Sequence, residues 1–298
     1  MKRAKAFSFS LLAVLLGQLA GWNGTCTPLE AAEQASKGKV LVLVSSSSVL
    51  NLKDGVKHPT GFFLNELGVP LKALVEAGYE PVFMDPMGNE PSMDTVSDKP
   101  RFFGHDLKEY DAVKAFVEEL PGLKHPKKIS ELAAIDLSQY VGLFAPGGHA
   151  PMEDLWKQAA LGKILRYFHE HKKPTALICH GPIALLAAAD HPESIIAQVK
   201  KDPAKAKSVD KWTYAGYRMT VFSNAEEKPN EGKGALGGYM FFYPEDALRA
   251  AGAELKIAPP GQGHVEVDRE LITGQNPNSD KELAEKFLQA LNRQNSAR

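Results

Sequence analysis

The stretch "PTALICHGPIALLAAAD", residues 174–190, changes character abruptly at its centre. Its first part, "PTALIC", is a short apolar run that predicts a buried strand, and its last part, "PIALLAAAD", predicts a helix. A strand followed at once by a helix is the repeating unit of an α/β fold. Cys179 and His180 stand at the junction. A cysteine there is either an inert core residue beside a turn or a nucleophile.

The rest of the chain repeats this alternation. The run "KVLVLVSSSS" at 39–48 is continuously apolar before its serines, which is typical of a parallel strand covered on both faces. Further strands are predicted at 80–85, 141–150, 174–179, 217–223 and 264–274. Helices are predicted at 62–79, 152–171, 182–190, 243–252 and 279–294. The fold class is therefore α/β with a largely parallel sheet.

Composition excludes several classes of protein. Of the 298 residues, 44% are hydrophobic and 24% are charged, and the formal net charge is -1. Without a basic excess, we expect no nucleic acid partner. The chain has only 2 cysteines, which rules out a disulfide scaffold and a cysteine-rich zinc site.

The N-terminal segment resembles a secretory signal peptide. A basic start, "MKRAK", precedes the uncharged apolar run "AFSFSLLAVLLGQLAG" and then a zone of small and polar residues. We expect a leader within residues 1–35, cleaved between Ala20 and Ala35, and export to a bacterial periplasm without stable membrane insertion after cleavage. Residues 36–298 then form one domain. The mixed segment 86–138 is interpreted as an insertion or lid.

Three predicted strand ends carry residues suited to chemistry. They are Ser45 to Ser48, Gly147–Gly148–His149 and Cys179–His180–Gly181. Ligands of an open α/β sheet gather beyond the carboxyl ends of its strands. A cysteine at the start of a helix is favoured as thiolate by the helix dipole, and paired glycines can present N–H groups to an oxyanion. Taken alone, each pattern is more often structural.

Several motifs together resemble one family. "APGGHAPMEDL" followed by "ICHGPIALLAA" is similar to the ThiJ/PfpI superfamily, which has a class I glutamine amidotransferase-like fold. "TGFFLNELGVP", "FSNAEE" and "HVEVDRELITGQNP" resemble its branch of heat-shock chaperones and glutathione-independent glyoxalases (glyoxalase III). The resemblance covers nearly all of the chain from Lys39 onward. It implies a flavodoxin-like three-layer sandwich with helices on both faces of a largely parallel sheet.

The resemblance also implies roles for particular residues. Cys179 matches the family nucleophile, and His180 matches the neighbouring histidine. Glu227 matches the carboxylate that orients this histidine, with the adjacent Glu226 as the alternative. Glu66 matches a buried glutamate that contacts the nucleophile.

The expected binding groups are mainly backbone. The resemblance assigns oxyanion binding to Gly148 and to the backbone of His180, and Gly147, His149 and Gly181 are expected to bind the oxyanion or substrate with them. His149 and His264 are expected to line the pocket. Some members of the branch bind a metal through a histidine just after the proline matched by Pro70, but "PLKALVEAG" has none. We therefore expect neither a metal nor a cofactor.

The implied function is an exported, cysteine-dependent glyoxalase III-like lyase. It would convert methylglyoxal or related reactive carbonyls to hydroxy acids, with deglycase activity on glycated groups as an extension. Two alternatives stay open: a holdase chaperone for unfolded client proteins, and a cysteine amidase or peptidase. Redox sensing through Cys179 is a minor further interpretation. A homodimer is expected from the resemblance alone.

Overall fold

The computed structural model describes residues 36–207 and 211–296. The predicted leader, its cleavage site and Cys26 lie outside the described residues. Within the described part of the chain, no helix is long and apolar enough to cross a membrane.

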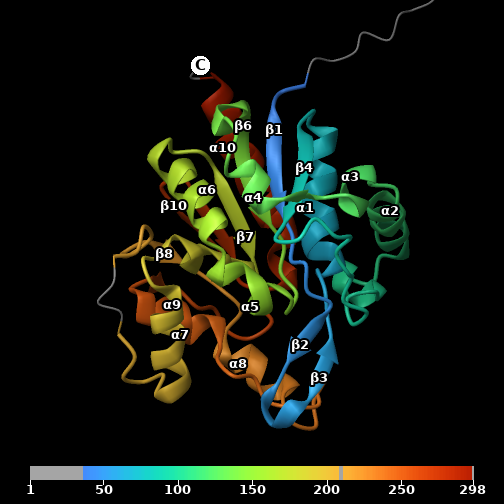
Figure 1. Ribbon diagram of the computed structural model, residues 1–298. Helices are drawn as coiled ribbons and strands as arrows, with labels where there is room; N and C mark the ends of the chain where they lie inside the picture. The colour runs from blue at the N-terminus through green and yellow to red at the C-terminus, as the bar shows by residue number, and fades with distance from the viewer. Residues whose placement is uncertain (1–35, 208–210, 297–298) are drawn as a thin grey trace, which may run out of the picture. The chain divides into compact units, whose positions relative to one another are not determined.

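A mainly parallel sheet organises the described chain (Figure 1). Its seven described strands are, in spatial order, β10 (Val265–Asp268), β11 (Leu271–Gly274), β7 (Thr175–Ile178), β6 (Tyr140–Ala145), β1 (Lys39–Leu43), β4 (Glu80–Asp85) and β5 (Lys127–Lys128). The antiparallel partner is β10, which forms a hairpin with β11. Two small pairs lie outside this sheet: β2 (Val49–Asn51) with β3 (Lys57–Pro59), and β8 (Arg218–Met219) with β9 (Glu254–Leu255).

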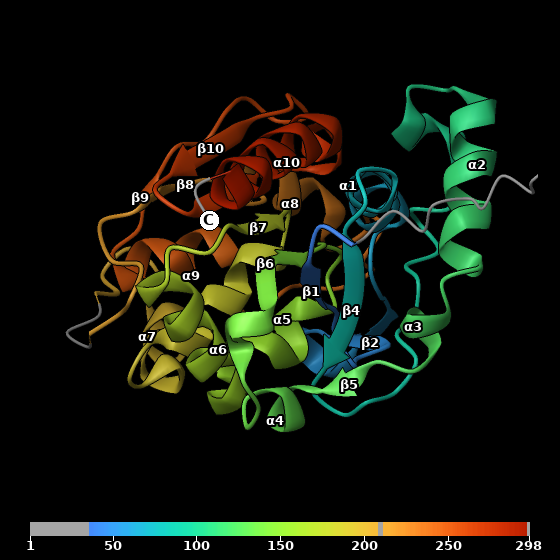
Figure 2. The same cartoon turned by 90° about the horizontal axis from the view of Figure 1, so that it is seen from above.

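Helices cover both faces of the sheet, as Figure 2 shows along the strands. The α-helices are α1 (Leu64–Glu76), α2 (Leu107–Glu118), α3 (Pro121–Lys124), α4 (Ile129–Leu132), α5 (Pro151–Asp154), α6 (Ala159–Glu170), α7 (Pro192–Lys201), α8 (Asn224–Glu227), α9 (Pro244–Ala251) and α10 (Asp280–Ser296). The 3-10 helices are η1 (Lys53–Gly55), η2 (Pro100–Phe103), η3 (Leu137–Gln139), η4 (Leu155–Lys157), η5 (Gly181–Ala188), η6 (Lys228–Asn230) and η7 (Pro277–Ser279).

Side-chain alternation along β1 explains the layers. Val40 and Val42 pack with the apolar faces of α1 and α10. Leu41 and Leu43 point the other way and pack with α6 and η5. Successive strand residues point to opposite faces, so a strand buried on both sides must be apolar throughout. The predicted α/β fold, with a largely parallel sheet and helices on both faces, is confirmed.

Two predicted elements have different forms in the structure. The helix expected at 152–171 is broken at Gln158, whose backbone is extended. In a continuous helix Trp156 and Leu161 would point in divergent directions, whereas the break lets both reach the core. The strand expected at 217–223 pairs only over Arg218–Met219 in β8.

The segment 86–138 lies along one side of the sheet. Its longest helix, α2, packs on the outer side of α1, next to Gly68 (Figure 2). A Cβ at Gly68 would lie 2.3 Å from a methyl carbon of Val113 in α2, so the small residue permits this close packing. β5 from the same segment extends the sheet beyond β4. Its origin as an insertion stays a prediction.

Candidate active site

Cys179 occupies a strained turn directly after β7. Its backbone φ is 60°, in the left-handed region that is costly for a residue with a side chain. Two backbone hydrogen bonds hold this turn: the Cys179 N–H donates to Gly274 O at 2.8 Å, and the Phe222 N–H donates to Cys179 O at 2.9 Å. η5 begins two residues later, at Gly181. This strand, strained nucleophile and helix arrangement is that of a nucleophile elbow.

The paired glycines let a second loop approach the cysteine. A Cβ at Gly147 would lie 2.5 Å from both Cys179 Cβ and a carboxyl oxygen of Glu66. Gly148 has a φ of 87°, and a Cβ there would lie 2.0 Å from Gly61 O. The Gly148 backbone N–H faces the thiol and lowers its pKa, although other effects outweigh it. This placement is the one an oxyanion-binding N–H requires.

Gly181 lies where the carboxyl ends of β6 and β7 meet. A Cβ at this position would lie 2.8 Å from Pro146 O and 3.0 Å from Ala145 O, so the turn after Cys179 packs directly on the end of β6.

The third predicted strand end, Ser45 to Ser48, is not brought to the cysteine in the same way. The Ser45 hydroxyl donates to Asp154 at 2.7 Å, and Ser45 does not line the cavity that contains Cys179.

Glu66 is fully buried in the first turn of α1, beside Cys179. Burial raises the pKa of its carboxyl from 4.5 to about 8, while interaction with the Cys179 thiol lowers it by a smaller amount. Neither carboxyl oxygen meets a partner with good hydrogen-bond geometry among the described residues. Glu66 therefore carries a proton at neutral pH and can donate it to a group that forms at Cys179.

His180 connects the thiol to a second carboxylate. Its Nδ1 lies 3.3 Å from Cys179 Sγ, and its Nε2 lies 2.6 Å from Glu227 Oε2. The ring is 1% exposed and stacks on Phe222 with centroids 4.7 Å apart. Because an ionised carboxylate can only accept, Nε2 carries the proton, and the Nδ1 lone pair faces the thiol.

The structure distinguishes Glu227 from Glu226. Both belong to α8, whose N-cap Ser223 forms a capping box with Glu226. This role turns Glu226 away from His180. Glu227 is fully buried and faces the histidine. The position first matched in the sequence, rather than its neighbour, therefore completes the chain from thiol to imidazole to carboxylate.

His149 shares the same carboxylate, which the sequence did not indicate. Its Nε2 lies 3.0 and 3.1 Å from the two oxygens of Glu227. Its ring centroid is 4.2 Å from that of His180. His149 is thus a pocket residue, as expected, and also a partner of Glu227. His264 lies elsewhere, with its Nε2 3.0 Å from Glu266.

Burial and charge divide the protons among these groups. Burial raises the pKa of Glu227, but His149 and His180 outweigh this and hold that pKa well below its usual range. Burial and the neighbouring His149 lower the pKa of His180. For His149, burial lowers the pKa but Glu227 raises it by more, and the net shift is upward. These shifts favour an ionised Glu227, a protonated His149 beside it and a neutral His180.

The thiol itself differs from the expectation of a ready thiolate. Burial raises the pKa of Cys179 well above its usual value, and the neighbouring Glu66 raises it further. Burial disfavours a charged sulfur more strongly than the dipole of the short η5 helix favours it. Cys179 thus rests as a thiol, with the neutral His180 as the base that can take its proton.

His149, His180 and Glu227 also form a set of metal-ligand type. One ligand atom from each lies within 4.8 Å of the others, and two histidines with one carboxylate are suited to a divalent transition metal. A metal there would need the Nε2 atoms that now face Glu227. Hydrogen bonding and metal binding are therefore alternative uses of the same atoms. The absence of a metal stays a prediction.

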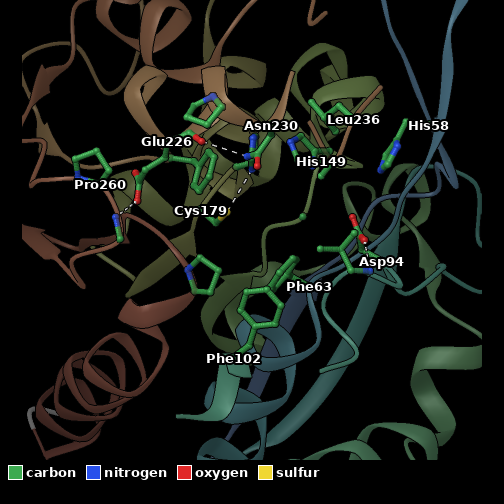
Figure 3. A pocket seen from close by; sticks show the side chains of 18 of the residues that line it. His58, Phe63, Asp94, Phe102, His149, Cys179, Glu226, Asn230, Leu236 and Pro260 are labelled. Atoms are coloured by element: carbon green, nitrogen blue, oxygen red, sulfur yellow. Dashed lines mark hydrogen bonds between the residues drawn. The ribbon is translucent and has the colours of Figure 1, made fainter. Parts of the chain in front are cut away.

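The thiol opens into a cavity of about 470 Å³ (Figure 3). In this view, His58 and Asp94 lie on one side of Cys179, Glu226 and Pro260 lie on the other, and Phe63 and Phe102 lie below. Asp94 and Phe102 come from the segment 86–138. These residues were not predicted as site residues, because no local motif marks a side chain that reaches a pocket from a distant loop.

Comparisons with known proteins show what this chain is similar to. The model of the DJ-1/PfpI family matches residues 59–194, a range that contains the glutamate, the paired glycines and the cysteine. A protein/nucleic acid deglycase HchA of Pseudomonas aeruginosa is 28% identical over 265 residues, covering 86% of this chain and 82% of the relative. A deglycase of the same name from Staphylococcus aureus is 26% identical over 258 residues, covering 85% and 80%.

A solved structure shares the fold. The crystal structure of glyoxalase III from Candida albicans aligns with a TM-score of 0.60 and 22% identity, over 85% of this chain and 97% of that chain. The resemblance inferred from separated motifs is confirmed, because the DJ-1/PfpI family model matches the part of the chain that contains most of them and the similar relatives span most of the chain.

Proposed function

We propose that this protein is a cysteine-dependent, glutathione-independent glyoxalase, with deglycase activity as an extension. One observation carries the proposal: Cys179 Sγ lies 3.3 Å from the Nδ1 of a neutral His180 and beside the buried carboxyl of Glu66, at a cavity. The names of the relatives, a protein/nucleic acid deglycase and a glyoxalase III, support the same class of reaction.

The first step is addition of the thiol to an aldehyde. His180 Nδ1 takes the proton of Cys179 while Sγ forms a bond to the aldehyde carbon. Glu227 stabilises the imidazolium that results, at 2.6 Å from its Nε2. The former carbonyl oxygen takes the proton of Glu66 and becomes the hydroxyl of a hemithioacetal, held near the Gly148 N–H.

The second step is an internal redox shift. The ionised Glu66 takes a proton from the carbon bound to sulfur and returns it to the neighbouring ketone carbon. The proton of the hemithioacetal hydroxyl passes to the ketone oxygen, so that a hydroxyacyl thioester of Cys179 forms without an external oxidant. Glu66 has a pKa of about 8, which suits a group that donates and recovers protons near neutral pH. Water then cleaves the thioester. For methylglyoxal the sum is one water consumed and one lactate released.

The decisive experiment is lactate formation from methylglyoxal without glutathione. We expect turnover by the purified protein, none by Cys179→Ala, and a strong loss in Glu66→Gln. Turnover in the presence of a chelator would support the hydrogen-bonded use of His149 and Glu227. Absence of lactate from the wild-type protein would overturn the proposal.

The same preparation separates the alternatives. Suppression of client aggregation that survives Cys179→Ala, without lactate formation, would identify a holdase. Amide cleavage that is lost in Cys179→Ala would identify an amidase or peptidase. A homodimer remains part of the proposal and is tested by the mass of the protein in solution.

Export is proposed from residues 1–35 alone, which lie outside the described structure. The leader pattern supports a mature protein in the periplasm. Fractionation of cells with and without this segment tests it, and retention of the full chain in the cytoplasm would contradict it.

A further inference from the structure

The cavity offers more space than a small dicarbonyl needs. Its volume of about 470 Å³ falls in the range of roughly 300–1,000 Å³ that holds drug-sized ligands. Methylglyoxal at Cys179 would fill only part of it. The remaining wall, including His58 and Asp94, therefore faces whatever else a substrate carries beyond its reactive carbonyl (Figure 3).

Asp94 presents a rigidly held carboxylate to this space. The residue is 3% exposed. One carboxyl oxygen accepts a hydrogen bond from the Val96 N–H at 2.9 Å, and the other accepts from the Thr60 hydroxyl at 3.3 Å. Its own N–H donates to Phe62 O at 2.9 Å. These bonds orient the carboxylate before any ligand arrives.

Asp94 has no ion-pair partner among the described residues, although its charge acts at longer range on His149 and His58. His58 lines the same side of the cavity, but burial lowers its pKa, so it is uncharged at neutral pH. Burial lowers the pKa of His149 while Glu227 and, to a smaller extent, Asp94 raise it by more, but its Nε2 is already bound to Glu227. A buried, unpaired carboxylate attracts a cation far more strongly than an exposed one.

The other charged groups of the cavity are weaker candidates. Glu226 is surrounded by hydrogen-bond donors, which are Ser223, Gly261, Gln275 and Asn276. Arg101 is exposed and stands over the Phe102 ring at 4.6 Å. Solvent and salt screen its charge more than they screen that of Asp94.

We propose that Asp94 makes the pocket selective for reactive carbonyl compounds that carry a positively charged nitrogen several bonds from the carbonyl carbon. The carbonyl is held at Cys179 and the cation at Asp94. This inference rests on the proposed carbonyl chemistry and adds to it the charge of the substrate. Asp94 is a specificity residue and takes no part in the proton transfers.

The test uses three phenylglyoxals that differ only at the para position. They carry a trimethylammonio group, its neutral isostere tert-butyl, or a carboxylate. For the wild-type protein we expect kcat/KM for the cation to exceed that for the neutral compound at least about tenfold. In Asp94→Asn that ratio falls to about one. Asn keeps the Oδ1 acceptor for the Val96 N–H, and its Nδ2 replaces Oδ2 and can donate to the Thr60 hydroxyl, which preserves the loop.

Asp98→Asn is the matched control. Asp98 belongs to the same segment but pairs with Lys114 at 2.8 Å and does not line the cavity. This variant should retain the wild-type ratio. An equal ratio in Asp94→Asn and wild type would overturn the inference, and so would a wild-type preference for the carboxylate, which would instead favour Arg101.

A binding measurement separates this inference from the proposed function. Calorimetry with the same cationic and neutral compounds in the Cys179→Ala background requires no turnover. We expect the cation to bind about tenfold more tightly than its isostere, and the Asp94→Asn change to abolish this preference. Absent turnover with intact cation preference would reject the glyoxalase proposal alone. Intact turnover without cation preference would reject the role of Asp94 alone.

Discussion

A histidine–glutamate pair lies at each end of the sheet's strands, and its histidine is buried at one end and half-buried at the other. At the carboxyl ends of the strands, His180 Nε2 lies 2.6 Å from Glu227. At the amino ends, His169 Nδ1 lies 2.9 Å from Glu270, the residue just before β11. The residue types and the distances are similar, yet the surroundings differ.

The pair at the amino ends is enclosed by structural contacts. The Tyr217 hydroxyl lies 2.9 Å from His169 Nδ1 and 3.1 Å from Glu270. The guanidinium of Arg269 lies 3.4 Å from the centroid of the Tyr217 ring. Glu270 O also accepts from the Thr175 N–H, which fixes the start of β7. The group joins the ends of two strands to the loop before β8.

The pair at the carboxyl ends has a nucleophile and a cavity beside it. Cys179 supplies the thiol, and its positive φ directs the side chain into the space between the two glycine turns. A histidine–carboxylate pair can therefore act in catalysis only where a nucleophile and a substrate cavity lie beside it. The following variants test this contrast, in order of decreasing effect.

The largest effect is expected at the nucleophile. Cys179→Ala should reduce lactate formation at least about 10³-fold, because no other group forms the bond to carbon. Far-UV circular dichroism and the thermal midpoint should show a folded protein. Substantial residual turnover in a folded variant would show that Cys179 is not the nucleophile, so that the two histidine–glutamate pairs would no longer differ in this respect.

The two glutamates give the direct comparison. Glu227→Gln should reduce kcat by roughly 10²–10⁴-fold, because the imidazolium of His180 loses its stabilising charge. Glu270→Gln should leave kcat/KM unchanged and lower the thermal midpoint. Steady-state kinetics on the two variants side by side measure this. Equal losses of kcat would show that the distinction between the pairs is wrong.

Glu66 gives an effect that depends on pH. Its folded pKa of about 8 exceeds its unfolded value of 4.5, so the wild-type protein loses stability as pH rises between these values. Glu66→Gln removes this loss. The free energy of unfolding of Glu66→Gln, relative to that of the wild-type protein, should therefore rise by on the order of 4 kcal/mol between pH 4.5 and pH 8.

Denaturant unfolding at several pH values checks the Glu66 prediction. Tyr217→Phe is a suitable control, because burial and Glu270 raise the pKa of Tyr217 and it does not titrate in this range. A constant difference between Glu66→Gln and wild type across pH would mean that Glu66 is ionised when folded.

The smallest effect is expected from the tyrosine of the amino-end group. Tyr217→Phe removes the hydroxyl that contacts His169 and Glu270. The free energy of unfolding should fall by about 1–2 kcal/mol, since a buried hydrogen bond is lost while the ring remains. Turnover should be unaffected. A loss of activity would show that the groups at the amino and carboxyl ends of the strands are coupled.

The sequence revealed the parts of the site that are local. Cys179, His180 and Gly181 are contiguous, and the change from strand to helix around them can be recognised without a structure. Glu66 and Glu227 emerged only through family resemblance, because each lies in an unremarkable helical segment. The distinction between Glu227 and Glu226 depended on the capping box of α8, which assigns the two neighbours to different partners.

Other features could not be predicted, because they depend on long-range packing. His149 and Glu227 are 78 positions apart, and nothing in either neighbourhood marks the other. The strand expected at 217–223 is short because the Thr220 N–H donates to the Thr273 side chain instead of a strand backbone. The helix expected at 152–171 is broken at Gln158, which allows Trp156 and Leu161 both to reach the core. Each outcome was decided by a neighbour distant in sequence.

The sequence by itself determined the α/β alternation, the buried parallel strands and the place of the cysteine at a strand end, because these depend on residue order within a few turns of chain. The tertiary structure decided which carboxylate meets His180, where protons reside and which charge faces the cavity. The physical reason is burial: the pKa of Glu66 and the unpaired charge of Asp94 depend on what surrounds them, and folding alone brings those surroundings together.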